Sequence, residues 1–284
     1  MTADEWIKAA SYRLTGLERP RAEARNLLAL ALQVSPEYLF SYPETEISAE
    51  NISTAELFIE RRIVGEPLSR ISGFREFWSL KFCIGDEVLD PRPDTEILVE
   101  AGLEAIKQRE IPYILDLGTG SGCILLALLS EIRDAFGIGI DRAKCACRFA
   151  KRNSQRLGLS NRSAFVCADW GRALKAVTSQ FQGFDLIVTN PPYVGTVQGP
   201  RPDTATESFD PPSALYAGID GLSAYKELSH QIPKLMAANG TVVIEIGEGQ
   251  AASVNKIFAD AGLRMKGEFY DLGGHLRCLT FKVA

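Results

Sequence analysis

The sequence predicts an α/β fold, in which a mostly parallel sheet with an antiparallel last strand follows a small helical domain and a β-hairpin linker. Three observations indicate this fold. Apolar residues recur at helical spacing through residue 73, the period changes to two from Phe77, and strand and helix patterns alternate after residue 112. Such alternation is typical of βαβ units, whose strands run parallel.

Length and composition place the chain among ordinary globular proteins. It has 284 residues, of which 46% are hydrophobic and 24% charged, and this suits about two domains of roughly 150 residues. The longest apolar run, Cys123 to Leu129, is far shorter than the roughly 18 residues of a membrane span. Asp4 and Glu5 open the chain and no apolar stretch follows them, so we expect no signal peptide and a cytoplasmic location.

Charge and reactive side chains narrow the classes of function. The net charge of −5 argues against a broad nucleic-acid surface and is compatible with a basic protein partner. We expect no stable nucleic-acid partner and no membrane, and we predict a monomer. His230 and His275 are the only histidines, and their separation argues against a metal site. The six cysteines form no C-x-x-C pair and are predicted to be reduced, buried thiols: Cys83, Cys123, Cys145, Cys147, Cys167 and Cys278.

Residues 1–73 are predicted to form the helical domain. Pro20 and Pro36 suit the first turns of two helices, and the second follows a capping residue at Ser35. Ser48 is predicted to begin a longer helix that stops at Gly65. Residues 1–75 hold 9 basic and 11 acidic side chains, which gives no nucleic-acid footprint. We expect this domain to recognise the substrate.

The linker and a larger domain follow. Alternating side chains from Phe77 to Ile84 predict a β-hairpin in the linker, residues 74–89. In residues 90–284 a helix should begin near Thr95. The expected strands are 113–117, 136–141, 163–167, 184–190 and 241–246, and the expected helices are 122–133, 142–157, 221–237 and 249–262. Consecutive strands at 264–270 and 276–283, joined by a Gly273-Gly274 turn, indicate that one of them runs antiparallel.

A glycine-rich loop after the strand 113–117 is the first candidate site. The sequence Gly118-Thr119-Gly120-Ser121-Gly122 lets the backbone approach a ligand and leads into a helix N-terminus. A dinucleotide fingerprint would have glycine where this chain has Cys123, and the Gly-Lys of a Walker A loop is absent. The loop therefore favours a nucleoside without a pyrophosphate. The alternative is a tight strand–helix turn without a ligand.

Two acidic positions follow the next two strands. Asp141 lies roughly 20 residues past the glycine loop, where a carboxylate can accept hydrogen bonds from both ribose hydroxyls. Its alternative role is to cap the helix 142–157. Asp169 and Trp170 could hold an adenine through its amine and by packing, or they could be a capping residue and a buried aromatic.

The most specific motif is Asn190-Pro191-Pro192-Tyr193, at the end of a buried strand. Neither proline has an N–H, so the loop presents carbonyl oxygens without competing donors, and the residue before each proline is held extended. Asn190 adds a side-chain carbonyl and Tyr193 a flat ring. This acceptor-rich group suits the NH2 of a planar substrate, and a structural Pro-Pro turn is the alternative.

Together these features resemble class I S-adenosylmethionine-dependent methyltransferases, over roughly residues 90–284. A narrower resemblance, to the HemK/PrmC family, covers the full length. It rests on the helical N-terminal domain and on Arg75-Glu76-Phe77-Trp78, Pro91-Arg92-Pro93-Asp94-Thr95-Glu96, Asp116–Gly122 and Asn190–Tyr193. The family methylates the glutamine of the Gly-Gly-Gln motif in class-1 peptide-chain release factors. This chain has Asp210-Pro211 where the family usually has Glu-Pro.

The resemblance implies a Rossmann-like methyltransferase sheet, S-adenosylmethionine as cofactor, no metal, and a release factor as protein substrate. The residues and the resemblance together predict cofactor contacts from Gly118, Thr119, Gly120, Ser121, Gly122, Asp141, Asp169, Trp170 and Asn190. They predict that catalysis and substrate binding fall to Asn190, Pro191, Pro192 and Tyr193.

We expect the Asn190 side-chain carbonyl and the Pro191 backbone carbonyl to accept the two N–H bonds of the substrate amide, which aligns its nitrogen and stabilises positive charge developing there. Two alternatives stay open. One is methylation of an exocyclic amine on a DNA or RNA base, which should require a basic surface; the acidic balance counts against it. The other is an inactive release-factor or ribosome adaptor, and the intact motif counts against that.

Overall fold

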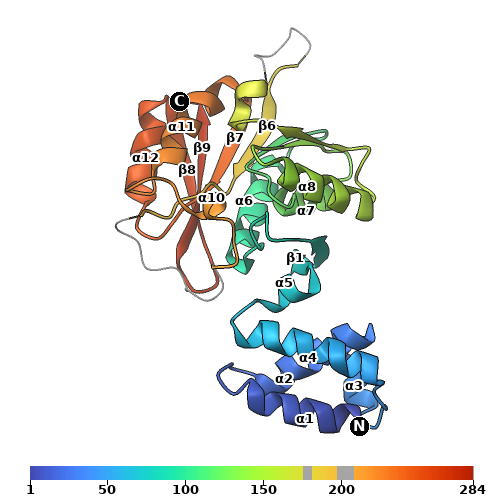
Figure 1. Cartoon of the computed structure of the whole chain (residues 1–284). Coiled ribbons are helices and arrows are strands. Elements are labelled where there is room, and N and C mark those ends of the chain that lie inside the picture. Colours follow the sequence, from blue (N-terminus) through green and yellow to red (C-terminus); the bar gives the residue numbers. More distant parts are fainter. Residues whose placement is uncertain (175–180, 197–207, 284) are drawn as a thin grey trace. The chain divides into compact units, whose positions relative to one another are not determined.

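A computed structural model of the chain describes residues 1–174, 181–196 and 208–283 (Figure 1). One compact unit contains Met1–Gly73, and a second contains most of the chain from Phe74 onward. Within the described residues, no helix combines the length and the apolar character needed to cross a bilayer.

The N-terminal unit is a set of helices around its own apolar core. Its helices are α1 (Ala3–Arg13), α2 (Pro20–Leu32), α3 (Pro36–Ser41), α4 (Ala49–Ile63) and α5 (Leu68–Ser72). The predicted starts are confirmed: both prolines open helices, and the Ser35 and Ser48 hydroxyls accept hydrogen bonds from backbone N–H groups in the first turns of α3 and α4. Trp6, Leu27 and Ile59 are among its fully or almost fully buried side chains.

The predicted hairpin forms, but its two strands do not coincide with the alternating run from Phe77 to Ile84 that predicted it. Strands β1 (Phe74–Phe77) and β2 (Leu80–Cys83) flank a turn at Trp78 and Ser79. Both turn residues have positive φ, 53° and 56°, in a two-residue loop where Asn-Gly is usual. Trp78 is held there because its backbone N–H and its indole N–H donate to Glu96 and Glu131, at 2.8 and 2.7 Å. The alternating run from Phe77 therefore spans a turn.

The second unit is built on a seven-stranded sheet in the described part of the chain. Its order is β5-β4-β3-β6-β7-β9-β8, and β9 is antiparallel to both of its neighbours, as the two last strand patterns predicted. The strands are β3 (Tyr113–Leu117), β4 (Phe136–Asp141), β5 (Ser163–Cys167), β6 (Phe184–Thr189), β7 (Met236–Glu245), β8 (Leu263–Tyr270) and β9 (Leu276–Val283).

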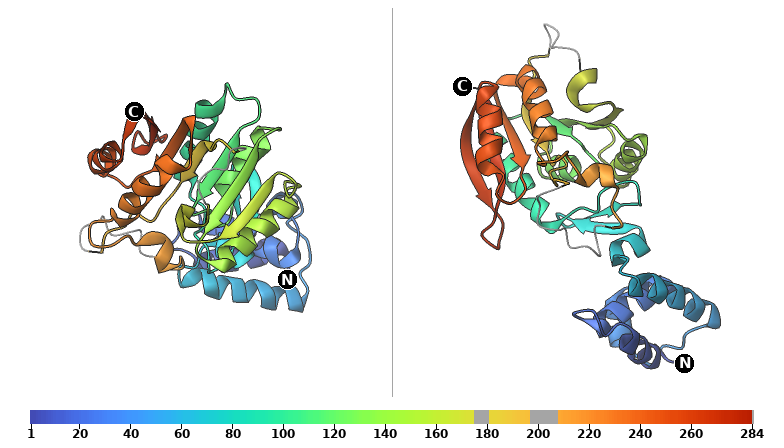
Figure 2. Two further views of the ribbon diagram at one scale, coloured as in Figure 1. Left: turned by 90° about the horizontal axis from the view of Figure 1, so that it is seen from above. Right: turned by 60° about the vertical axis from the view of Figure 1, so that its left-hand side comes forward.

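Helices cover both faces of this sheet (Figure 2). On one face α6 (Glu96–Ile106), α7 (Cys123–Glu131) and α8 (Lys144–Arg156) pack, and the hairpin joins that core. On the other face lie α11 (Ser223–Gln231) and α12 (Ala251–Asp260). The predicted α/β class is confirmed. Short helical segments that were not predicted are η1 (Pro93–Thr95), η2 (Trp170–Ala173) and α10 (Pro212–Leu215).

Two predictions about single elements are wrong. The helix expected over 221–237 ends early, because Pro233 lacks an N–H and only a 3-10 turn, η3 (Ile232–Lys234), follows α11. The strand expected at 241 begins instead at Met236, with a register shift against β6. The thiols also differ from expectation, because Cys167 is exposed at the end of β5, the edge strand of the sheet. Cys83, Cys123 and Cys278 are buried.

Candidate functional site

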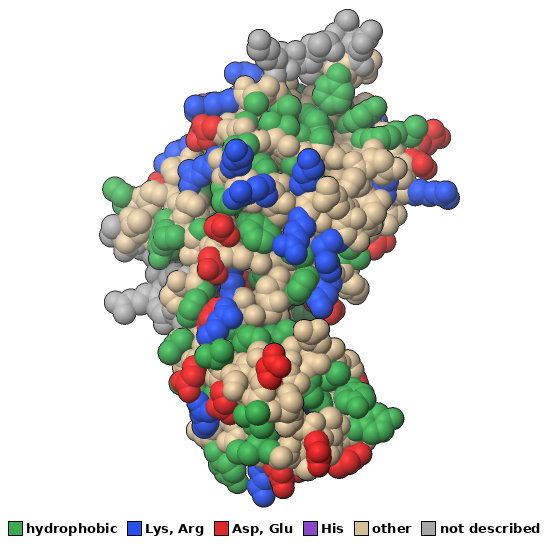
Figure 3. Space-filling view, turned by 45° about the vertical axis from the view of Figure 1, so that its right-hand side comes forward, with side chains coloured by type: hydrophobic (Ala, Val, Ile, Leu, Met, Phe, Trp, Pro, Cys, Tyr) green, Lys and Arg blue, Asp and Glu red, His purple; other side chains and the backbone are tan. Residues whose placement is uncertain are grey.

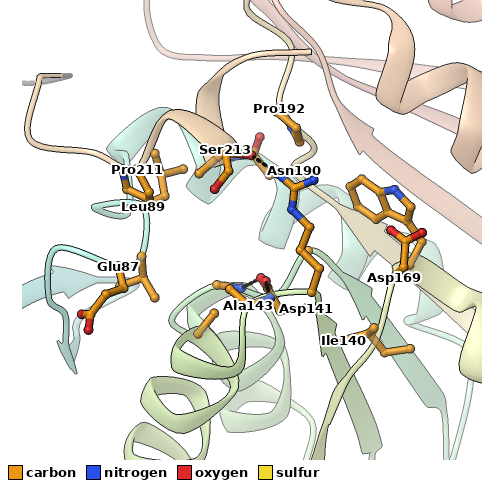
Figure 4. A pocket seen from close by; sticks show the side chains of 17 residues that line it. Glu87, Leu89, Ile140, Asp141, Ala143, Asp169, Asn190, Pro192, Pro211 and Ser213 are labelled. Atoms are coloured by element: carbon orange, nitrogen blue, oxygen red, sulfur yellow. Dashed lines mark hydrogen bonds between the residues drawn. The ribbon is translucent and has the colours of Figure 1, made fainter. Parts of the chain in front are cut away.

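A pocket opens at the carboxyl ends of β3, β4 and β6 (Figure 4). Open α/β sheets bind ligands at this edge, where strand order reverses. Seven of the predicted site residues line the pocket: Gly118, Gly120, Asp141, Asp169, Trp170, Asn190 and Pro192. The remaining lining residues are Glu87, Val88, Leu89, Ile140, Arg142, Ala143, Ala146, Pro211, Ser213 and Ala214.

The three glycines of the loop are needed for different reasons. Gly118, Gly120 and Gly122 all have positive φ, at 80°, 53° and 81°, a region that favours glycine. A Cβ at Gly122 would lie 3.0 Å from that of Ala150, so this glycine lets the loop pack on α8. A Cβ at Gly120 would meet nothing within 4 Å. Gly120 is therefore the position at which the backbone meets open space in the pocket.

The loop residues Thr119 and Ser121 lie beneath the pocket instead of lining it. Both are buried, with 3% and 2% exposure. The Thr119 hydroxyl donates to Asp116 at 2.6 Å. Burial raises the pKa of Asp116 to about 7, with a contribution from the nearby charge of Asp141. No separate signal in the sequence indicated this supporting role for Asp116.

Asp141 ties the loop to the start of α8. Its two carboxylate oxygens accept the backbone N–H of Gly120 at 2.9 Å and of Ala143 at 2.8 Å. The alternative role as a helix cap is wrong, because the cap residue of α8 is Ala143 and Asp141 instead accepts the N–H of that residue. A carboxylate has about four acceptor positions, so these two bonds leave capacity for further donors from the pocket, toward which the side chain faces (Figure 4).

Asp169 and Trp170 form another wall of the pocket. Trp170 has a φ of 49°, and its ring lies 3.3 Å from the position of a Cβ at Gly118, so a side chain at that glycine would meet the indole. Asp169 is half-exposed and pairs with Arg172 at 3.2 Å. The aromatic and the carboxylate therefore both lie at the pocket, as the second acidic position suggested.

The structure separates the four residues of the Asn-Pro-Pro-Tyr motif. Asn190 and Pro192 line the pocket, whereas Pro191 is buried. The Asn190 side-chain N–H donates to the Thr95 hydroxyl at 3.2 Å. Tyr193 is not among the lining residues; its hydroxyl lies 3.5 Å from Glu245 Oε1, and its carbonyl accepts from Gln250 at 3.0 Å.

Glu245 lies behind this motif, at the end of β7, and sequence analysis missed it. It is 3% exposed. Burial raises its pKa to about 7, against the lowering effect of a hydrogen bond from Thr95 and of the charge on Arg277. In the described residues its Oε2 atom has no hydrogen-bond partner. The available signal was an acid closing the apolar run Val242-Val243-Ile244.

A second set of missed residues is held by Asp210. This side chain is 5% exposed, accepts the backbone N–H of Asp90 at 3.0 Å, and pairs with Arg92 at 2.5 Å. The chain that follows carries Pro211, Ser213 and Ala214 into the pocket wall. The sequence signal was Asp210-Pro211 itself, an acid before a proline in a long connection.

Known proteins match both parts of the chain. Residues 5–73 match the PrmC N-terminal domain, and residues 112–264 match a methyltransferase domain. The chain is 43% identical to the release factor glutamine methyltransferase of Rhodospirillum rubrum, over 94% of this chain and 80% of that protein. It is 38% identical to the protein of the same name from Agrobacterium fabrum, over 99% of this chain and 97% of that one.

Solved structures share the fold. One is the hMettl16 catalytic domain in complex with a MAT2A 3'UTR hairpin, with a TM-score of 0.56 and 15% identity over 82% of this chain and 80% of that one. Another is the ribosomal protein L11 methylase of Lactobacillus delbrueckii subsp. bulgaricus, with a TM-score of 0.50 and 16% identity over 69% of this chain and 81% of that one. At such low identity the likeness concerns the fold alone.

Proposed function

The chain belongs to the release factor glutamine methyltransferase family, and from this membership we propose that it methylates the side-chain amide nitrogen of the glutamine in the Gly-Gly-Gln motif of class-1 peptide-chain release factors. The observation that carries the proposal is the oriented amide of Asn190, which stands next to two donor-free prolines in the pocket that the glycine loop and Asp141 also line.

The residues of the pocket fit S-adenosylmethionine. Gly120 leaves open space for a close approach, and Asp141 retains acceptor capacity for ribose hydroxyls. The indole of Trp170 offers a flat apolar surface. Asp141 and Asp169 both line the pocket, and two carboxylates suit a ligand that carries positive charge. When bound, this cofactor supplies an electrophilic methyl group on a positive sulfur.

Asn190 holds the substrate amide in this proposal. Because its Nδ2 donates to Thr95 at 3.2 Å, its Oδ1 is turned away from Thr95 and remains available as an acceptor. Thr95 is 2% exposed, so the hydroxyl that accepts this hydrogen bond is itself held in the protein interior. The bond therefore fixes the orientation of Asn190 before substrate arrives, which is the preorganisation that makes an electrostatic contact effective.

The prolines complete the acceptor set. A glutamine amide presents two N–H donors; Asn190 Oδ1 takes one and the Pro191 carbonyl takes the other. Neither proline has a backbone N–H, so no donor here can bind the carbonyl oxygen of the substrate amide and turn its nitrogen away from the acceptors. With both N–H bonds held in the amide plane, the nitrogen presents its face to the methyl group, and the two acceptors stabilise the positive charge that develops there. One of these N–H bonds then breaks and its proton passes to solvent, which leaves a neutral N-methyl amide.

The test is methyl transfer to a purified release factor, followed by mass spectrometry of the peptide with the Gly-Gly-Gln motif. We expect one methyl group on the glutamine, and none when that glutamine is replaced by alanine. Double-stranded DNA and tRNA are assayed beside it, since an enzyme of the same fold could act on base amines. Transfer to either nucleic acid and not to the release factor would overturn the proposal.

A further inference from the structure

Helix α8 carries a row of exposed cations on one side. Lys144, Arg148, Arg152 and Arg156 are all exposed and follow one another at intervals of four residues, so they lie along one helix face. At 1.5 Å per residue the row is about 18 Å long. We refer to these four residues as the α8 stripe. Figure 3 is turned toward the side on which Figure 1 shows α8, and Lys and Arg side chains gather there.

No acidic residue lies near the stripe in the sequence. Residues 142–168 contain no Asp or Glu, although the protein as a whole has 36. Like charges four residues apart destabilise a helix, and a cation in the first turn, as at Lys144, opposes the helix dipole. The arrangement therefore works against the stability of α8.

Neighbouring cations have internal partners that three of the four stripe residues lack. Arg162 donates to the carbonyls of Leu129, Ile132 and Ala135, at 2.8 to 3.0 Å. Arg142 donates to the carbonyl of Ser213 at 3.2 Å. By contrast, Lys144, Arg148 and Arg152 form no ion pair within the ranges that the structure describes. A structural role therefore accounts for Arg162 and Arg142 but not for Lys144, Arg148 and Arg152.

The stripe begins at the pocket. Arg142, Ala143 and Ala146, at the N-terminal end of α8, line it. At the other end the Arg156 guanidinium lies over the ring of Phe74, 5.1 Å from its centroid, and Lys81 of the hairpin lies over the same ring at 4.5 Å. A partner whose reacting group occupies the pocket thus finds a continuous row of positive charge leading from the pocket to the hairpin.

We propose that the α8 stripe is the docking surface for an acidic face of the release factor, engaged while its glutamine occupies the pocket. This inference rests on the proposed function. A protein partner is favoured over RNA for two reasons. Without the four cations the net charge of the chain falls from −5 to −9, so a long polyanion would meet a repulsive surface beyond the stripe. In addition, Lys81 and Arg156 both lie over the ring of Phe74, the aromatic residue at the far end of the stripe. This ring therefore offers no free face on which a base could stack.

The experiment compares two variants that change charge equally. The stripe variant is K144Q/R148Q/R152Q, which spares Arg156 because that residue packs on Phe74. The control variant, K256Q/R264Q/K266Q, removes three exposed cations from α12 and β8, at the opposite edge of the sheet from α8. For each protein we would measure KM and kcat toward the release factor at low and high salt, cofactor affinity, binding of the release factor and of tRNA by titration, and Tm.

We expect the stripe variant to raise KM roughly tenfold at low salt, the lower end of electrostatic steering effects, with unchanged kcat and cofactor affinity. The difference should shrink at high salt, and Tm should not fall, since repulsion within α8 is relieved. The control should behave as the wild type.

Equal KM and equal binding of the release factor by the stripe and control variants would refute the inference. So would loss of tRNA binding in the stripe variant with unchanged release-factor binding, which would assign the stripe to RNA. If the wild type binds the release factor but transfers no methyl group to it, the proposed function fails, and the binding titration still decides the role of the stripe.

Discussion

Asn190 is the side chain on which the chemistry depends most directly. Asn190→Ala removes the oriented acceptor and should slow methyl transfer by roughly 100- to 1,000-fold, the usual cost of losing one preorganised partner. Cofactor affinity should change little, because the glycine loop and Asp141 remain. Asn190→Asp keeps an acceptor oxygen and should retain part of the activity. Single-turnover transfer measured beside cofactor affinity checks this, and a wild-type rate in Asn190→Ala would contradict the proposed role.

Asp141 should combine a binding role with a structural one. Asp141→Ala is expected to lose about 1.5–3 kcal/mol of cofactor affinity, the range for hydrogen bonds to a charged group. It should also lower Tm, because two backbone N–H groups lose their acceptor. Asp141→Asn keeps one acceptor oxygen, so its cofactor affinity and its Tm should lie between those of the wild type and of Asp141→Ala. Calorimetric titration with S-adenosylmethionine gives the affinity, and an unchanged value in Asp141→Ala would exclude the ribose contact.

Glu245 predicts a pH dependence of stability. Its pKa rises from 4.5 to about 7 on folding because the carboxyl is buried. The folded protein thus holds the proton more tightly than the unfolded chain, so the stabilisation is complete below pH 4.5 and is lost as the pH rises through 7. Glu245→Gln does not titrate.

Relative to the wild type, Glu245→Gln should therefore gain unfolding free energy, and with it Tm, between pH 4.5 and 7 and then level off, the gain in free energy being no more than about 3.4 kcal/mol. Thermal unfolding of both proteins across that range measures the difference. A difference that is constant with pH would show that the carboxyl does not change its affinity for the proton on folding.

At the scale of elements, the glycine loop and α8 meet in a close contact at Gly122. Gly122→Ala combines a left-handed backbone, which costs about 1–2 kcal/mol without glycine, with a Cβ 3.0 Å from Ala150. Gly120→Ala has the same backbone strain but no contact within 4 Å, so it is the matched control. Gly122→Ala should lower Tm by more than Gly120→Ala does, and equal losses would show that packing on α8 adds nothing.

Local patterns predicted the elements where a single signal was clear. Proline with a capping serine placed α3, and a strand followed by three glycines placed the loop. Patterns failed where distant segments decide the outcome. The Trp78 turn depends on Glu96 and Glu131, and the pocket wall near Ser213 depends on Asp210 meeting Asp90 and Arg92, some 120 residues away. Thr95 and Glu245 were missed for the same reason, since only the fold brings Thr95 to Asn190 and Glu245 to Tyr193.

At the scale of the whole molecule, we expect the two compact units to have separate functions, cofactor binding in one and substrate recognition in the other. Every residue that lines the pocket lies in the unit that begins at Phe74. A shortened chain from Phe74 to Ala284 should therefore bind S-adenosylmethionine with the affinity of the full chain. It should methylate a release factor poorly if, as we propose, residues 1–73 recognise that substrate. Full activity of the shortened chain on an intact release factor would end this proposal.

The position of Trp170 in the pocket also allows ligand binding to be followed by tryptophan fluorescence. The chain has three tryptophans: Trp6 is enclosed in the N-terminal unit at 2% exposure, Trp78 is at the hairpin turn, and only Trp170 lines the pocket. Replacing Trp6 and Trp78 by phenylalanine would leave a single indole whose fluorescence responds to whatever enters beside it. Ligand occupancy could then be followed in real time without a label, separately from the transfer of the methyl group.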